Sequence, residues 1–204
     1  MASRRDEIIE TAAELFAARG FDATSMRDIA SASGILASSL YSHFKSRAEL
    51  LTLTVRPFLD ELEAEQARVT ALSSSGLERL REMVRAVLTL CAGHHRAVTI
   101  LHYSWPHIRT APELAELVAA NSGVLSCWES LIAAGVDDGS IRRDIDVTVV
   151  ARLVTSAIQG LSDPQRYDDP IGLVGRQGVE RLYGDISRLL LDSLVASANY
   201  SHVP

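Results

Sequence analysis

Residues 24–45 contain two short helical patterns separated by a single glycine, Gly34, and this stretch constrains the fold more than any other. Ser25 with Asp28 three residues later is the pattern of a capping box, so the spacing predicts a helix that begins directly after Ser25. Gly34 can supply the positive φ that a sharp chain reversal needs, and a second helix is predicted over residues 36–43. Two short helices joined by so tight a turn predict a helix-turn-helix.

The outer face of the second predicted helix has the chemistry of a DNA reader. Leu40 and Phe44, four residues apart, should face the core of a small helical domain. The other positions form a surface of small and polar side chains with one phenol and one imidazole: Ala37, Ser38, Ser39, Tyr41, Ser42 and His43. Lys45 and Arg47 follow at its far end, where cations can bind phosphates. A buried helical hairpin without a DNA role would need neither the polar face nor these cations.

Residues 4–50 resemble the N-terminal domain of TetR-family transcriptional repressors. The residues that carry the resemblance are Phe16, Gly20, Phe21, Thr24, Ser25, Ile29, Ala30, Gly34, Leu40, Tyr41, His43, Phe44 and Lys45. There is one departure, because the family usually has Ser or Thr where Leu36 stands. The Ser or Thr of the family would cap the recognition helix, and the loss of such a cap lowers stability by roughly 0.5–2 kcal/mol.

The resemblance implies two groups of DNA contacts. Phosphate contacts are implied for Ser25, Arg27, Tyr41, Lys45 and Arg47, with Thr24 beside them. Base contacts are implied for Ser38, Ser39, Ser42 and His43. Leu36 and Ala37 would then be placed to touch thymine methyl groups.

The distribution of charge matters more here than its sum. The net charge of −6 argues against a general nucleic-acid binder. However, Arg27, Lys45 and Arg47 bracket the second predicted helix, and Lys45 is the only lysine in the sequence. Arg4 and Arg5 are predicted to form a basic arm. We therefore expect a small basic surface on an acidic protein.

Apolar residues recur at helical spacing through the rest of the chain, which predicts an all-α fold. The predicted helices lie at about residues 4–19, 47–72, 77–91, 113–134, 147–161 and 175–196. We expect a three-helix helix-turn-helix DNA-binding domain over residues 1–46 and a larger helical ligand-binding and dimerisation domain over residues 47–204. The helix over residues 47–72 would act as a lever between them.

Five residues give specific predictions about helix boundaries. Ser46 and Glu49 form a second capping-box pattern at the start of the lever helix. Pro57 lies inside that helix and predicts a kink. Pro106 should end the apolar run before it, and Gly135 should end the helix before it.

The last two predicted helices are strongly apolar. The helix over residues 147–161 is apolar nearly all round, which predicts burial on most sides. The resemblance implies that this helix and the one over residues 175–196 form a four-helix bundle with a second copy of the chain. A homodimer would place two recognition helices on a palindromic operator in double-stranded DNA.

The resemblance also implies a small organic effector. An apolar lining with a few polar heads, the usual mix for such a site, is offered by His102, Tyr103, Trp105, Arg109, Cys127, Trp128 and Gln159. Residues 34–44 and the pair His94 and His95 are similar to repressors of steroid catabolism that respond to acyl-CoA thioesters. The phosphates of such a ligand would favour arginines, and the candidates are Arg96, Arg109, Arg152, Arg166 and Arg176.

Two other classes of function stay open. Cys91, His95 and His102 would share one face of a continuous helix and suit zinc, which would make a metal-responsive repressor. A helical protein-interaction domain without DNA binding is the other alternative. No cofactor is expected, and no enzyme either, because the sequence lacks a Gly-x-Ser-x-Gly motif, a phosphate-cradling glycine loop and a His-Glu-x-x-His motif.

A cytoplasmic protein with no membrane association is expected. The two cysteines, Cys91 and Cys127, do not make a disulfide framework. The charged N-terminus is no signal peptide, and no run of 18 apolar residues predicts a transmembrane helix.

Overall fold

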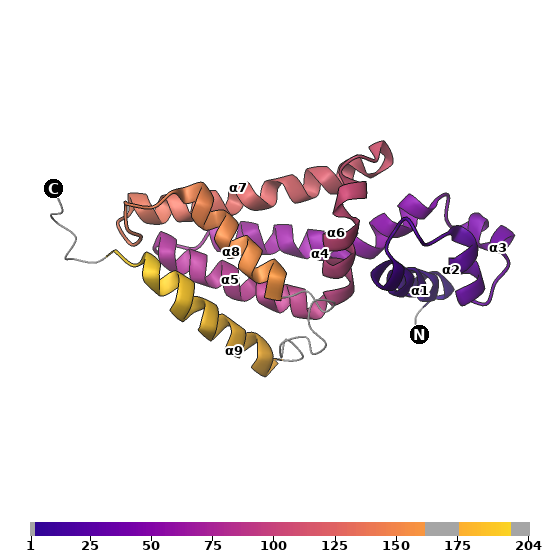
Figure 1. The fold of residues 1–204 in the computed structure, drawn as a ribbon, viewed down its shortest axis with the longest axis horizontal. Helices are drawn as coiled ribbons and strands as arrows, with labels where there is room; N and C mark the ends of the chain where they lie inside the picture. Colours follow the sequence, from indigo (N-terminus) through magenta and orange to yellow (C-terminus); the bar gives the residue numbers. More distant parts are fainter. Residues whose placement is uncertain (1–2, 162–175, 197–204) are drawn as a thin grey trace. The chain divides into compact units, whose positions relative to one another are not determined.

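The computed structural model describes residues 3–161 and 176–196 and shows an all-helical chain over these residues, as the sequence predicts (Figure 1). The helices are α1 (Arg4–Arg19), α2 (Met26–Ala32), α3 (Ala37–His43), α4 (Arg47–Thr70), α5 (Gly76–Gly93), α6 (His95–Ile108), α7 (Ala115–Asp137), α8 (Val147–Leu161) and α9 (Arg176–Ile186). Short 3-10 segments, η1 (Pro112–Leu114) and η3 (Asp192–Leu194), and a π-helical segment, η2 (Ser187–Leu191), complete the set. A single bridge between Ile141 and Val195 is the only β pairing within these ranges.

The helices form two compact units. Unit 1 comprises Met1–Glu61 and His94–Asn121, and unit 2 comprises Leu62–Gly93 and Ser122–Pro204. Helix α6 therefore belongs to the same unit as the predicted DNA-binding helices, although it follows them by about fifty residues. The functional division at residues 46 and 47 stays a prediction.

Unit 1 is built on α1. Its buried face carries Ile8, Ala12 and Phe16, as its helical spacing predicts, and Ile29 and Leu40 close the core from α2 and α3. Helix α6 packs along α1, and Arg96 pairs there with Glu10 and Glu14. The first helix is thus covered on one side by the helix-turn-helix and on another by α6.

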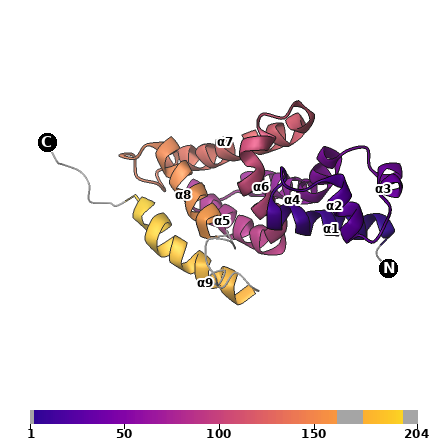
Figure 2. The same ribbon diagram turned by 45° about the vertical axis from the view of Figure 1, so that its right-hand side comes forward.

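Unit 2 is built on α5, against which α8 and α9 pack (Figure 2). The start of α5 is held by residues from the far end of α7. The Gly76 N–H donates to Asp138 Oδ2 at 2.6 Å, and the Leu77 N–H donates to Ser140 Oγ at 3.1 Å. These bonds satisfy backbone donors that a helix start would otherwise leave without partners. The Ser140 hydroxyl and then the Gly76 amide, by hydrogen bonding to the carboxylate, lower the pKa of Asp138.

Two predicted helix ends were wrong. Helix α6 continues through Pro106 to Ile108, and α7 continues through Gly135 to Asp137. Gly135 is a packing residue, because a Cβ atom on it would lie 2.5 Å from Ile141 Cδ1. Its backbone in turn requires a glycine at position 76, where a Cβ atom would lie 2.1 Å from the Gly135 nitrogen. The chain reverses instead at Gly139, which has φ +77°.

Helix α8 buries less of itself than its composition predicts. Ala151, Val154 and Ile158 form its buried face, but Val149 is 52% exposed and Leu153 is 56% exposed. Its bounds agree with the prediction, whereas the last predicted helix divides into α9, η2 and η3. An apolar face on α8 is therefore open within a single chain.

One stretch, Pro112–Asp137, has the length and apolar content of a membrane-crossing helix. The core helices of soluble proteins often share both properties, so this finding alone assigns no membrane location.

Candidate nucleic-acid interface

The start of α2 is fixed by a complete capping box. Ser25 has extended backbone angles, and its Oγ accepts a hydrogen bond from the Asp28 N–H at 3.2 Å. Asp28 in turn accepts from the Ser25 N–H at 2.8 Å and from the Ser25 hydroxyl. These bonds favour the ionised carboxylate, and they lower the pKa of Asp28. The predicted helix start is confirmed.

The turn between α2 and α3 depends on Gly34. Its φ of +66° lies in the left-handed region that favours glycine, as predicted. The Ile35 N–H reaches back to the Ala30 carbonyl at 3.0 Å, and Arg4 donates to the Ser33 carbonyl. Arg4 thus binds the end of α2, so it does not form the free basic arm expected from the sequence.

Helix α3 is held by its core side and has no side-chain cap. Leu40 and Phe44 are fully buried, as predicted, while Leu36 at the N-cap makes no side-chain cap and is 76% exposed. The guanidinium of Arg5 lies 5.0 Å from the centre of the Phe44 ring. Arg5 therefore also packs on the domain.

The outer face of α3 is open to solvent. Its exposed side chains are Ser38, Ser39, Tyr41, Ser42 and His43, followed by Lys45, while Ala37 is half-buried. The Ser42 hydroxyl donates to the Ser39 carbonyl at 2.7 Å and keeps its acceptor lone pairs for a ligand. Ser25 and Arg27 on the neighbouring helix are also exposed. This surface can offer short polar groups to base edges and cations to phosphates.

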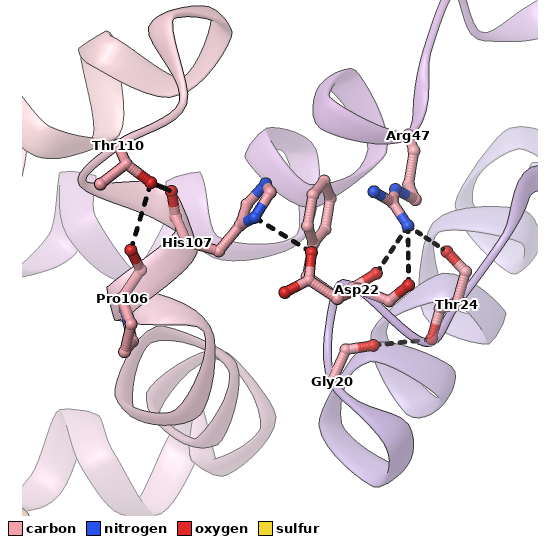
Figure 3. Close-up of polar contacts among 8 residues, drawn as sticks. Gly20, Asp22, Thr24, Arg47, Pro106, His107 and Thr110 are labelled. Carbon is pink, nitrogen blue, oxygen red and sulfur yellow. Dashed lines mark hydrogen bonds and ion pairs between the residues drawn. The ribbon is translucent and has the colours of Figure 1, made fainter.

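Two of the predicted contact residues are engaged elsewhere. Thr24 is fully buried, and its hydroxyl donates to the Gly20 carbonyl at 2.8 Å (Figure 3). Arg47 is half-buried, and its Nη1 donates to the Thr24 carbonyl at 2.9 Å. Both residues therefore hold the turn before α2, and Thr24 offers no surface to DNA.

The second predicted capping box is only half formed. Ser46 Oγ accepts from the Glu49 N–H at 3.1 Å, as expected. The Glu49 carboxylate accepts from the Lys45 N–H at 2.6 Å, whereas a full box would use the Ser46 N–H. This bond fixes the backbone of Lys45 and leaves its side chain exposed.

Comparison with known proteins agrees with this geometry. Residues 8–53 match the family described as bacterial regulatory proteins, tetR family, and residues 73–163 match a tetracyclin repressor-like C-terminal domain. The chain is 36% identical over 153 residues to the HTH-type transcriptional repressor KstR2 of Mycolicibacterium smegmatis, which covers 75% of each chain. The chain belongs to the TetR family.

Two solved structures share the fold over most of the chain. The ketosteroid transcriptional regulator KstR2 of Mycobacterium tuberculosis superposes with a TM-score of 0.85 at 29% identity and covers 97% of both chains. AibR, solved in complex with isovaleryl coenzyme A and operator DNA, superposes with a TM-score of 0.75 at 26% identity. That match covers 93% of this chain and 99% of AibR.

The predicted effector residues fall in both units. In unit 1, the rings of His102 and Tyr103 meet edge to face at 5.0 Å, while Trp105 is half-buried and Arg109 is exposed. In unit 2, Trp128 is buried and Gln159 is exposed. Cys127 is half-buried there, and burial raises the pKa of its thiol. The effector pocket stays a prediction.

The zinc alternative loses the continuous helix on which it was based. Cys91 lies near the end of α5, which stops at Gly93, and His95 begins the separate helix α6. The continuous helical face assumed for Cys91, His95 and His102 therefore does not exist. Within residues 3–161 and 176–196, no group of three His, Cys, Asp or Glu residues is arranged to hold a metal ion.

Proposed function

We propose that this protein is a ligand-responsive transcriptional repressor that binds a palindromic operator as a homodimer. The observation that carries the proposal is the exposed polar face of α3, backed by the buried Leu40 and Phe44 and followed by the exposed Lys45. The relatives named as repressors support the direction of the regulation. A protein of this kind acts on DNA in the cytoplasm and needs no catalytic group.

The open face of α8 supports the homodimer. Val149 and Leu153 lie four residues apart and therefore on one side of the helix. Leu189 in η2 is 72% exposed and adds to the apolar surface of unit 2. We infer that a second copy covers these residues about a two-fold axis through α8 and the segment 176–196. The two α3 helices would then read half-sites about one turn of DNA apart.

An acyl-CoA thioester is the proposed effector. The support is the similarity to AibR, whose structure holds isovaleryl coenzyme A. Of the candidate arginines, Arg96 is already paired with Glu10 and Glu14. The exposed Arg109 and Arg152 are therefore the better candidates for the phosphates. Arg166 and the side chain of Arg176 lie outside the described residues.

The proposed mechanism couples the effector to the separation of the two α3 helices. Helix α4 runs unbroken from Arg47 to Thr70, through Pro57, and so joins the helix-turn-helix to the effector domain. A shift of this helix on ligand binding would change the spacing of the readers. A coupling free energy of about 1–3 kcal/mol would weaken operator binding roughly 5- to 150-fold.

The test is a footprint on the DNA upstream of the protein's own gene, repeated with short-chain acyl-CoA thioesters, coenzyme A alone and the free acids. A palindromic footprint that only a thioester releases supports the proposal in full. Release by a free acid would contradict the thioester, and the absence of a footprint at moderate salt would contradict the repressor function. A Val149→Glu, Leu153→Glu double variant should become monomeric and lose the footprint, because it places charge on the exposed apolar face of α8. The Val149→Leu, Leu153→Ile double variant keeps this face apolar and is the matched control.

A further inference from the structure

The ring of Phe21 lies between side chains from two helices that are distant in sequence. The guanidinium carbon of Arg47, at the start of α4, lies 4.0 Å from the centre of the ring. The imidazole of His107, in the last turn of α6, has its centre 4.8 Å away at a tilt of 44°. Phe21 is only 3% exposed, so both groups pack on a buried ring.

The same two side chains also bind the turn that carries Phe21. Nη1 of Arg47 donates to the carbonyl oxygens of Phe21 at 2.9 Å, Asp22 at 3.3 Å and Thr24 at 2.9 Å (Figure 3). His107 Nδ1 lies 3.0 Å from Asp22 Oδ1. The three accepting carbonyls all lie within four residues, directly before the N-cap of α2.

We propose that Arg47 and His107 are positioning residues of the DNA interface. They fix the turn of residues 21–24, and this turn sets where Ser25 and Arg27 meet the DNA backbone. Neither residue needs to touch DNA for this role. The inference rests on the proposed function only in assuming that this face binds the operator.

The chemistry of arginine suits this role better than a phosphate contact. A planar guanidinium can stack on an aromatic ring and donate from its edge at the same time, and a lysine ammonium cannot do both. Arg47 stacks on the Phe21 ring and donates to the carbonyls of the same turn. The sequence predicted a phosphate contact for Arg47 and did not indicate either of these interactions. Lys45, by contrast, is exposed, and its side chain is placed for a phosphate.

The placement of His107 gives the effector domain a second route to the DNA reader. The candidate effector residues His102, Tyr103 and Trp105 lie on the same helix, α6. A displacement of the last turn of α6 would change the packing on Phe21 and the contact with Asp22. The turn before α2 would then respond to α6 as well as to α4.

A salt titration of operator binding by the full-length protein separates positioning from phosphate contact. A residue that binds one phosphate contributes about 0.9 to the slope of log K against log salt, and a positioning residue contributes nothing. Arg47→Ala should therefore weaken binding by about tenfold, on the order of one charge-assisted hydrogen bond, with the wild-type slope. Lys45→Ala is the matched control and should lower the slope by roughly one. A slope lowered by about one in Arg47→Ala would overturn the inference.

Two further variants keep the test decisive if Arg47→Ala folds poorly. Arg47→Lys keeps the charge, so it should bind as weakly as Arg47→Ala if the residue positions the turn, and near wild type if it binds a phosphate. His107→Gln should also weaken binding several-fold at an unchanged slope, and wild-type affinity in this variant would remove His107 from the proposal. If the wild-type protein itself failed to bind the operator, the proposed function would fail and not this inference.

Discussion

The two helices of the helix-turn-helix are stabilised in different ways. Helix α2 begins in a reciprocal capping box between Ser25 and Asp28, and the turn before it is held by Arg47 and His107. Helix α3 begins at Leu36 with no side-chain cap. Both helices are seven residues long, so the difference in their stabilisation comes from their ends and not from their lengths.

The helix with the stronger local support, α2, is therefore not the helix that is predicted to contact the bases, α3. A helix of seven residues is not stable by itself in water and depends on its caps and its packing. Helix α2 has both kinds of support, whereas α3 depends on its buried residues Leu40 and Phe44. The start of α3 therefore has no side-chain cap to hold it and can adjust to a base sequence.

The largest expected effect comes from removing a core anchor of α3. Leu40→Ala should lower the free energy of unfolding by about 2–5 kcal/mol, because Leu40 is fully buried and no cap would compensate. Urea denaturation measures the change. Ser38→Ala on the exposed side of the same helix should stay within about 0.5 kcal/mol of wild type. Equal losses in both variants would show that α3 does not depend on its core side.

Removing the cap of α2 should have a smaller effect. Ser25→Ala should cost about 0.5–2 kcal/mol, since the Asp28 N–H and the Asp28 carboxylate both lose the Ser25 hydroxyl as a partner. The same denaturation experiment tests it, with Ser39→Ala as a serine control that caps no helix. An unchanged midpoint of urea denaturation would mean that packing alone stabilises α2, without the cap.

Adding a cap to α3 should increase the stability of the protein and so reduce the difference between the two helices. Leu36→Ser should stabilise the protein by up to about 1 kcal/mol, because a serine at this position can accept from the first turn. If Leu36 reads a thymine methyl group, the variant should also lose its preference at one base pair of the operator. Binding to a set of operators with single substitutions measures this. Unchanged selectivity among the operators would show that Leu36 does not contribute to base recognition.

The smallest expected effect is the loss, at acidic pH, of the stability that the Asp28 carboxylate contributes. The hydrogen bonds from Ser25 lower the pKa of Asp28 below its ordinary value, so the carboxylate stabilises the fold at neutral pH. This contribution is present above the pKa of the unfolded chain, about 3.9, and disappears as the pH falls through the lower pKa of the folded state. The stability difference between wild type and Ser25→Ala should therefore shrink below about pH 4. A difference that stayed constant down to pH 2 would contradict the charged cap.

The parts of this fold that depend on neighbouring residues could be predicted from the sequence. The capping box of Ser25, the positive φ at Gly34 and the buried pair Leu40 and Phe44 follow from spacings of four residues or fewer, and all are confirmed. The same spacings and the family resemblance together predict the DNA-binding surface, and its contact residues stay a prediction.

The features that depend on distant contacts could not be predicted. Gly135 resembles a helix terminator in sequence, and only the close approach of Ile141 and Gly76 shows that it is a packing residue. Arg47 follows Lys45 closely and was expected to share its role, but its partners lie on the turn 21–24. His107 gave no signal, because nothing in the sequence places it beside Phe21.

The membership of α6 in unit 1 limits how this protein can be recombined with others. A chimera that joined residues 1–46 to the effector domain of another regulator would keep Phe21 and Asp22 but exchange Arg47 and His107 for whatever the donor supplies. The reading helix would be inherited intact, while its supporting turn would be rebuilt by a foreign helix. If Arg47 and His107 position this turn as proposed, specificity for an operator and the strength of binding to it are separable properties, and only the first can be transplanted with the N-terminal segment alone.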